Sequence, residues 1–297
     1  MRVLVTGASG LIGSALVGSL EAAGHGVTRV VRSAPRDSEV LWDPAAGTMD
    51  AGRMEGHSAA VHLAGEPVTG RWTSAKKARI LGSRLHGTQL LSSTLAGLKP
   101  PPAVLVCASA VGFYGDRGSE TLDEESNQGS GFLPQVVRAW EAAAGPARAA
   151  GIRVVHLRFG IVLSRRGGSL PRMLLPFHLG LGGPVGSGSQ FISWVALDDA
   201  VRAIMHAIEK NRLAGPVNVV SPNSVTSREF ARTLGRVLRR PAFCRIPACM
   251  IRLILGEMGR ELLLSSIRAV PARLLASDFI FRYLALEGAL RHMLDRH

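Results

Sequence analysis

Three glycines near the start of the chain have the spacing of a phosphate-binding turn. Gly7, Gly10 and Gly13 stand in GASGLIG, directly after a strand-like stretch and directly before a helical pattern. Glycines let the backbone approach a pyrophosphate closely, and the N–H groups and dipole of the following helix stabilise its charge. The turn predicts dinucleotide binding, although an ordinary strand-to-helix turn is the alternative. The residues expected to contact the dinucleotide are Gly7, Ser9, Gly10, Leu11, Ile12 and Gly13.

The end of the second predicted strand indicates which dinucleotide is bound. An acidic residue there would bind the ribose hydroxyls of NAD, whereas a cation accommodates the 2′-phosphate of NADP. This chain has Val31 and Arg32 at that place, and no acidic residue lies between Arg32 and Asp37. We therefore expect NADP as the cofactor, with Val31 and Arg32 at its adenosine end. A surface arginine at the end of a strand is the alternative for Arg32.

The elements that must position these residues alternate between strands and helices. Several of the strands are almost wholly apolar, which argues for a parallel sheet covered by helices on both faces. We therefore expect an α/β fold, a doubly wound parallel sheet of the Rossmann type. The strands are expected at 1–7, 26–31, 59–65, 101–111 and 152–160, and the helices at 11–23, 73–96 and 131–150.

The composition of the sequence changes near Ser164, where a stretch rich in glycine and proline begins. We expect a dinucleotide-binding domain at 1–164 and a smaller C-terminal substrate domain at 165–297, with 190–221 folding back onto the main sheet. The elements expected in this half are strands at 191–197 and 216–221, helices at 198–210 and 227–240, and a short strand at 241–247.

Composition limits the class of protein. With 46% hydrophobic and 19% charged residues, the 297-residue chain has the composition of a globular protein. No apolar run approaches the ~18 residues of a membrane span. The first strand leaves no room for a signal segment, so we expect a cytoplasmic protein. The nine histidines show no metal-ligand spacing, and we expect no metal.

Positive charge is concentrated in the second half of the chain. Residues 151–297 carry 21 Lys and Arg against 9 Asp and Glu, whereas residues 1–150 are nearly balanced. An anionic ligand would explain this excess, because arginine binds phosphate and carboxylate through its planar fork of donors. The alternative is a compositional bias toward arginine. Nucleic acid is disfavoured as a partner, because the arginines are scattered and few aromatic residues could stack on bases.

Several longer stretches resemble a known family. LAG at 63–65, ASAVGFYGDRG at 108–118 and LPFHLGLGGPVGSG at 175–188 are similar to an atypical branch of the extended short-chain dehydrogenase/reductases. Its members are called epimerase family proteins, within the NAD-dependent epimerase/dehydratase superfamily. The resemblance covers essentially the whole chain. It implies a Rossmann domain, NADP binding and a small C-terminal domain.

The resemblance also assigns residues to the cofactor and reveals two departures. It makes Leu63, Ala64 and Gly65 the turn that passes the adenosine and ribose, and it brings Arg84 to the cofactor. Relatives have Glu at the position of Arg79. They also have His at the position of Ala196, so a mechanism that uses this histidine is in doubt here.

The residues expected to carry chemistry are not those of ordinary superfamily members. Those members place a Tyr-x-x-x-Lys pair on the helix at 131–150, whereas the matching residues here are Leu133 and Val137, which cannot transfer a proton. By the resemblance, Ser109 stands where extended members keep a Ser or Thr that bonds the reacting oxygen. The phenol of Tyr114, at a strand end, is the remaining candidate proton donor. Alternatively, Ser109 caps a turn and Tyr114 only lines the pocket.

Two histidines lie within apolar strands. We expect His62 and His156 to be core residues rather than catalysts.

These expectations lead to three functional hypotheses. The first is an NADP-dependent oxidoreductase or epimerase acting on a small anionic substrate, such as a nucleotide-linked sugar. The second, favoured by the missing Tyr and Lys, is a non-catalytic NADP-binding regulatory protein. The third is a nucleic-acid binder, whose affinity would fall steeply with salt. The sequence does not decide the oligomeric state.

Overall fold

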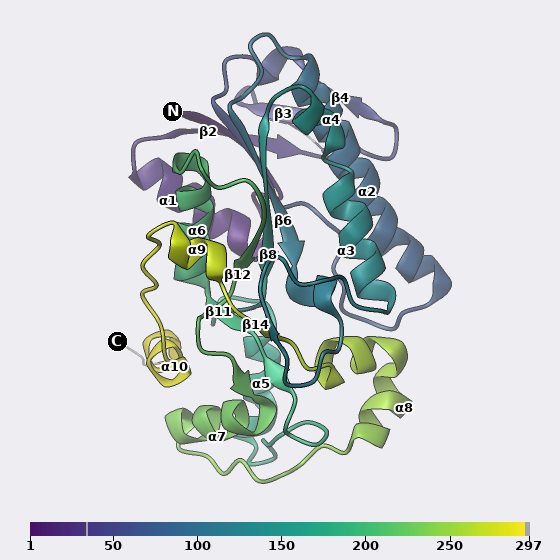
Figure 1. Cartoon of the computed structure of the whole chain (residues 1–297), viewed down its shortest axis with the longest axis vertical. Coiled ribbons are helices and arrows are strands. Elements are labelled where there is room, and N and C mark those ends of the chain that lie inside the picture. The colour runs from purple at the N-terminus through teal and green to yellow at the C-terminus, as the bar shows by residue number, and fades with distance from the viewer. Residues whose placement is uncertain (34, 295–297) are drawn as a thin grey trace.

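A sheet of eight strands forms the centre of the molecule (Figure 1). The computed structural model describes residues 1–33 and 35–294. Neighbouring strands are parallel except for the antiparallel pair β3–β4. From one edge to the other the strands are β12 (Gly215–Val219), β8 (Arg153–Phe159), β6 (Val104–Ala110), β5 (Ala59–His62), β1 (Arg2–Thr6), β2 (Gly26–Val31), β3 (Glu39–Asp43) and β4 (Thr48–Met49).

The strand order reverses beside β1. The chain first runs from β1 outward through β2 and β3, and then returns to the other side of β1 with β5 and continues outward through β6, β8 and β12. In open α/β sheets, ligands bind outside the carboxyl ends of the strands at such a switch point. The topology therefore directs attention to the carboxyl ends of β1 and β5.

Helices cover both faces of the sheet, as its apolar strands require (Figure 1). On one face α1 packs against α6, and on the other α2 packs against α3 and α4. The aliphatic side chains of β1, β5, β6 and β8 point alternately into the two resulting cores. The bounds are α1 (Leu11–Ala22), α6 (Leu197–Glu209), α2 (Ser74–Gly97), α3 (Phe132–Ala142) and α4 (Gly145–Ala149).

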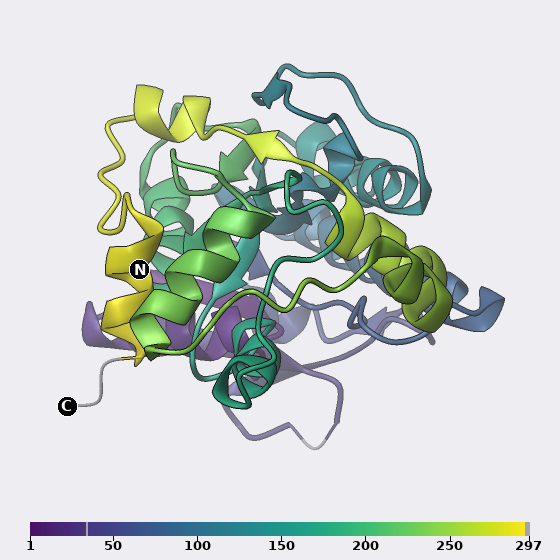
Figure 2. The ribbon, with the colours of Figure 1, turned by 90° about the horizontal axis from the view of Figure 1, so that it is seen from below.

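A smaller, mostly helical part lies beyond the carboxyl ends of the strands. Figure 2 shows α7 crossing this part with α10 beside it. Its core surrounds the fully buried Trp194 and includes Leu170, Phe230 and Leu290. Its helices are α5 (Leu170–His178), α7 (Ser227–Leu238), α8 (Ala248–Gly259) and α10 (Leu286–Leu294). The short helix α9 (Ala272–Ala276) lies instead against β12, and its Leu274 belongs to a core of the main sheet.

Three short strand pairs connect this part to the main sheet. They are β9 (Ile161–Leu163) with β11 (Trp194–Ala196), β10 (Phe191–Ile192) with β13 (Val225–Thr226), and β7 (Thr121–Leu122) with β14 (Arg268–Ala269).

The α/β architecture with a doubly wound, mostly parallel sheet and a smaller C-terminal part is as the sequence predicts. Residues 197–219 return to the sheet, because α6 packs on α1 and β12 pairs with β8. The helix expected at 131–150 is two helices, α3 and α4. The strand expected at 241–247 is absent from the described structure, where Ile246 makes only an isolated bridge with Val185.

Within the described residues, no helix is both long enough and apolar enough to cross a membrane.

Candidate cofactor and substrate site

The glycine-rich turn between β1 and α1 is packed too tightly for side chains. A Cβ added to Gly7, whose φ is +67°, would lie 2.7 Å from the carbonyl carbon of Leu63. A Cβ added to Gly13 would lie 2.1 Å from the carbonyl oxygen of Gly7. In the part of the chain that the structure describes, no side chain caps the first turn of α1. Helix starts of this kind, without a side-chain cap, bind anions through their backbone N–H groups in other proteins.

The turn after β5 lies directly against this glycine turn. Its backbone is fixed by Thr6, whose Oγ1 accepts hydrogen bonds from the N–H groups of Leu63 (3.1 Å) and Ala64 (3.3 Å). Thr6 Oγ1 also bonds His62 Nδ1 at 2.7 Å. Gly7 and Leu63–Gly65, which lie far apart in the sequence, are therefore adjacent at the switch point of the sheet.

Arg84, on α2, makes hydrogen bonds beside the turn after β5. Its Nη1 donates to the carbonyl oxygens of Glu66 (2.9 Å) and Ile80 (3.1 Å), and its guanidinium lies over the ring of Trp140. A Cβ at Gly65 would contact the guanidinium carbon at 3.5 Å. Burial lowers the pKa of Arg84 to about 10. Arg84 is thus bonded to the backbone of Glu66 and Ile80 next to Gly65, and its contact with the cofactor stays a prediction.

Arg32 is exposed at the end of β2, beside a carboxylate that cations surround. Glu66 Oε1 pairs with Lys76 Nζ at 2.7 Å and with Arg79 Nε at 3.8 Å. The hydrogen bond from Lys76, with the charges of Lys76, Arg79 and Arg32, lowers the pKa of Glu66. Arg79 thus adds positive charge at the same carboxylate as Arg32.

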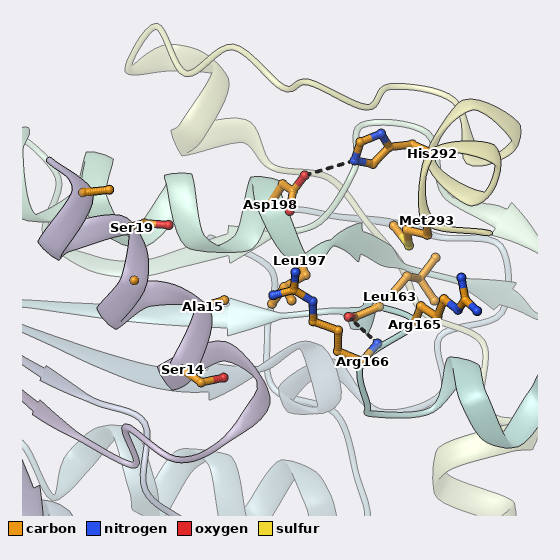
Figure 3. Close-up of a pocket in the computed structure, with 13 residues that line it drawn as sticks. Ser14, Ala15, Ser19, Leu163, Arg165, Arg166, Leu197, Asp198, His292 and Met293 are labelled. Atoms are coloured by element: carbon orange, nitrogen blue, oxygen red, sulfur yellow. Dashed lines mark hydrogen bonds and ion pairs between the residues drawn. The ribbon is translucent and has the colours of Figure 1, made fainter. Parts of the chain in front are cut away.

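A cleft lies between α1 and the loop at 164–169, and the sequence analysis assigned no role to this loop. The loop at 164–169 approaches α1, so that a Cβ at Gly168 would lie 3.1 Å from Leu11 Cδ2. Figure 3 shows Arg166 extending between α1 and the start of α6, while Arg165 lies nearer α10. The stretch SRRGG, with two cations beside two glycines, was the signal in the sequence.

The two predicted catalytic residues belong to one buried network. Ser109 Oγ donates to Glu141 Oε1 at 2.6 Å, and Arg158 donates to both oxygens of Glu141. Tyr114 is fully buried; its hydroxyl donates to Asn218 Oδ1 at 2.8 Å and accepts from Arg158 Nη1 at 3.1 Å. Burial raises the pKa of Tyr114, although Arg158 and Asn218 act in the opposite direction.

This network argues against the predicted proton-transfer role of Tyr114. The phenol of Tyr114 is closed off from solvent, and its hydroxyl is bonded to Asn218 and Arg158 rather than exposed at the apolar cavity described below. Ser109 is 3% exposed and its proton is directed at Glu141. Ser109 lies in β6 itself and Tyr114 in the single helical turn that follows it, and the sequence contained no signal for Asn218 or Arg158 as partners of Tyr114.

An apolar cavity of about 330 Å³ lies between the carboxyl ends of the strands and the C-terminal part. Leu133 and Val137 of α3 line it, so the residues in place of the Tyr and Lys pair do face a pocket. Glu261 lies at its wall and accepts hydrogen bonds from the N–H groups of Phe132 (2.9 Å) and Leu133 (2.8 Å). A residue remote in sequence thus holds the start of α3.

His62 and His156 are core residues, as the sequence predicts. Both are buried, and burial lowers the pKa of each to about 4. Among the described residues, no group of three or more His, Cys, Asp or Glu side chains could hold a metal ion.

Comparison with known proteins supports this description. Residues 3–220 match the model of the NAD dependent epimerase/dehydratase family, and residues 246–293 match a domain of unknown function, DUF1731. The chain is 42% identical over 296 residues to an epimerase family protein of Mycobacterium bovis, covering 99% of this chain and 98% of that one. It is 39% identical over 299 residues to the human epimerase family protein SDR39U1, covering 99% of both.

Two solved structures are similar over the whole chain. A crystal structure of human SDR39U1 (isoform 2) with NADPH superposes with a TM-score of 0.90 at 38% identity, covering 100% of both chains. A nucleoside-diphosphate sugar epimerase from Corynebacterium glutamicum superposes with a TM-score of 0.81 at 36% identity, covering 99% of this chain and 58% of that one.

Proposed function

Because the chain belongs to the NAD-dependent epimerase/dehydratase family, we propose that it is an NADP(H)-dependent oxidoreductase. The observation that carries the proposal is the contact between the glycine turn and the turn after β5, where a Cβ on Gly7 or Gly13 would collide with backbone. Backbone without side chains at the switch point of the sheet lets the pyrophosphate of a dinucleotide approach closely. The crystal structure of the human relative contains NADPH, which supports the choice of cofactor.

The residues present fit the parts of this cofactor. The N–H groups at the start of α1 would bind the pyrophosphate, and Leu63–Gly65 would pass the adenosine ribose. Arg32, with Arg79 nearby, would neutralise the 2′-phosphate. A bound nicotinamide donates or accepts a hydride. The apolar cavity beside Ala110 and Leu133 is where a substrate would meet it.

The protein's own residues contribute shape rather than acid–base chemistry at this cavity. Leu133 and Val137 exclude water from one wall, and the carboxylate of Glu261 is occupied by the start of α3. Ser109 donates into the Glu141–Arg158 pair. We therefore propose that the proton of the reaction is exchanged with water at the open edge of the cavity, where Leu181 is 59% exposed.

A second candidate function is an NADP(H)-binding regulatory protein without turnover. The presence of Leu133 and Val137 where ordinary members keep Tyr and Lys favours it.

Transfer of deuterium from NADPH labelled at C4 separates the two functions. The oxidoreductase should consume NADPH with at least one member of a panel of aldehydes and ketones, and mass spectrometry should find the deuterium in the product alcohol. Tight NADPH binding by calorimetry without any transfer would favour the regulatory protein. Failure to bind NADPH would contradict both.

A further inference from the structure

Resting on the proposed function, we propose that the substrate is an uncharged, largely apolar carbonyl compound or the corresponding alcohol. The inference depends on the cavity between the strand ends and the C-terminal part, which differs from what a nucleotide-linked sugar requires. We refer to it as the apolar cavity. Its residues come from α3, the ends of β6 and β8, α5, α7 and the segments 181–185, 191–193 and 261–267, together with Val68 and Ile246.

The walls of the apolar cavity are mostly aliphatic and aromatic. Leu133 and Val137 form the wall beside the strand ends, and Phe177 and Phe230 form the opposite wall from α5 and α7. A volume of about 330 Å³ is near the lower limit of the ~300–1000 Å³ usual for ligand pockets. The cavity therefore fits a small molecule that buries carbon.

The charge of the lining disfavours an anion. Among the described residues that line the cavity, Glu261 alone carries a charge, and there is no Lys or Arg. A sugar nucleotide would bring its phosphates toward this carboxylate, and the cation that pairs with it, Arg260 at 3.8 Å, does not line the cavity. Because burying an unpaired charge is costly, this lining does not support the anionic substrate expected from the basic C-terminal half.

The polar groups of the lining are already bonded within the protein. Ser193 Oγ donates to the carbonyl oxygen of Ile267 at 2.8 Å and accepts from the N–H of Ala269 at 2.9 Å. Ser227 Oγ accepts from the N–H of Val185, and Ser265 Oγ donates to the carbonyl of Arg260. Each sugar hydroxyl bound here would give up its hydrogen bonds to water and find few free partners in the cavity lining. Molecules with a single oxygen atom would give up the fewest hydrogen bonds to water.

The edge of the cavity is also apolar. Leu181 lines it and is 59% exposed, whereas the neighbouring Leu179 is similarly exposed but does not line it. These two leucines, two residues apart in the sequence, form a matched pair for a test.

Calorimetry with straight-chain primary alcohols from butanol to decanol tests the substrate class on the NADP-loaded protein. Each added methylene should tighten binding about threefold to fourfold until the cavity is filled, because each buries about the same apolar area. UDP-glucose should bind more weakly than decanol. Affinity that does not depend on chain length, or tighter binding of UDP-glucose, would overturn the proposal.

The matched variants locate the binding. Leu181→Glu should weaken decanol binding about tenfold, since it places a charge at the apolar edge, whereas Leu179→Glu should change it less than about twofold. Equal effects of the two variants, with unaltered thermal melting, would show that the alcohols bind elsewhere. NADPH formation is followed separately, so length-dependent binding without turnover contradicts the oxidoreductase and leaves the ligand class in place.

Discussion

Arg158 and Glu141 form a two-point ion pair beneath the candidate site. Nε of Arg158 lies 2.8 Å from Glu141 Oε1, and Nη2 lies 2.9 Å from Oε2. The arginine is 3% exposed and its guanidinium stacks on the ring of Phe113 at 3.6 Å. The pair links α3 to β8, and Ser109 from β6 bonds the same carboxylate. Three elements around the apolar cavity are therefore tied at one point.

Replacing Glu141 by Gln should destabilise the protein by ~3–5 kcal/mol, because it leaves the buried Arg158 charge uncompensated. Urea denaturation of the two proteins measures the difference. The exposed pair Arg29–Glu21, at 3.8 Å, provides the control, since Glu21→Gln should cost only ~0–1 kcal/mol. Equal losses in the two variants would contradict the importance of the buried pair.

His156 should make stability depend on pH between about 6.5 and 4. Burial and the charges of Arg148 and Arg158 lower its folded pKa to about 4, although Glu141 acts in the opposite direction. An unfolded histidine takes up a proton below about pH 6.5, but the folded one does so only below about 4. The histidine's contribution to stability is thus complete above pH 6.5 and falls as the pH is lowered, by up to ~1.4 kcal/mol per pH unit.

The measurement is urea denaturation at pH 7, 6 and 5 for the wild type and for His156→Gln. The free energy of unfolding of the variant should fall less steeply over this range, whatever its absolute value. Identical slopes for the two proteins would exclude His156 as a source of the pH dependence.

Gly13→Ala should impair both stability and cofactor binding. The added Cβ would lie 2.1 Å from the carbonyl oxygen of Gly7, so the phosphate-binding turn has to move. Gly18→Ala is the matched control in the same helix, since its Cβ meets nothing within 4 Å. Alanine there should stabilise the helix by roughly 0.5–1 kcal/mol. Calorimetry with NADPH and thermal melting of both variants check the prediction. Unchanged NADPH affinity in Gly13→Ala would refute the assigned site.

The preference for NADP over NAD should depend on Arg32. If Arg32 pairs with the 2′-phosphate, NADP binds more tightly by roughly 1.5–3 kcal/mol, and Arg32→Ala reduces the gap chiefly by weakening NADP. Arg29→Ala, on the same strand but paired with Glu21, should leave the gap unchanged. Calorimetric titration with both dinucleotides measures it. Equal affinities in the wild type would remove the basis for the assignment.

The sequence predicts the fold and the phosphate-binding turn because both depend on local signals. Apolar strands of regular length and glycines at fixed spacing identify β1, β5, β6 and β8, and the place of Gly7–Gly13. The strands β3 and β4 lack such a signal. They alternate exposed and buried residues over a few positions at a sheet edge, where neighbours rather than intrinsic pattern decide the structure.

The chemistry of the site is less predictable, because it depends on long-range partners. Tyr114 is next to the strand end in sequence, but Asn218 and Arg158, remote by 104 and 44 residues, hold its hydroxyl in the core. Glu261 bonds the start of α3 across 128 residues or more. No periodicity or spacing in the sequence indicates such pairs, and hence the sequence alone could not show that the hydroxyl of Tyr114 is bonded in the core, whereas the glycine spacing lies within one short stretch.

Replacing Tyr114 by Phe should therefore affect stability rather than catalysis. Losing the hydroxyl leaves Asn218 Oδ1 and an N–H of Arg158 without a partner in a buried environment, which should cost ~1–3 kcal/mol in urea denaturation. Because the hydroxyl does not reach the apolar cavity, kcat for any substrate found should change less than about twofold, and NADPH affinity should be unchanged. If Tyr114 transferred the proton, the substitution would instead lower kcat by ~10²–10⁴-fold. Val137→Ala, which does line the cavity, should raise KM for an apolar substrate with a smaller loss of stability than Leu133→Ala. A large fall in kcat for Tyr114→Phe, with stability retained, would reinstate Tyr114 as the catalytic acid and contradict the buried network as its sole role.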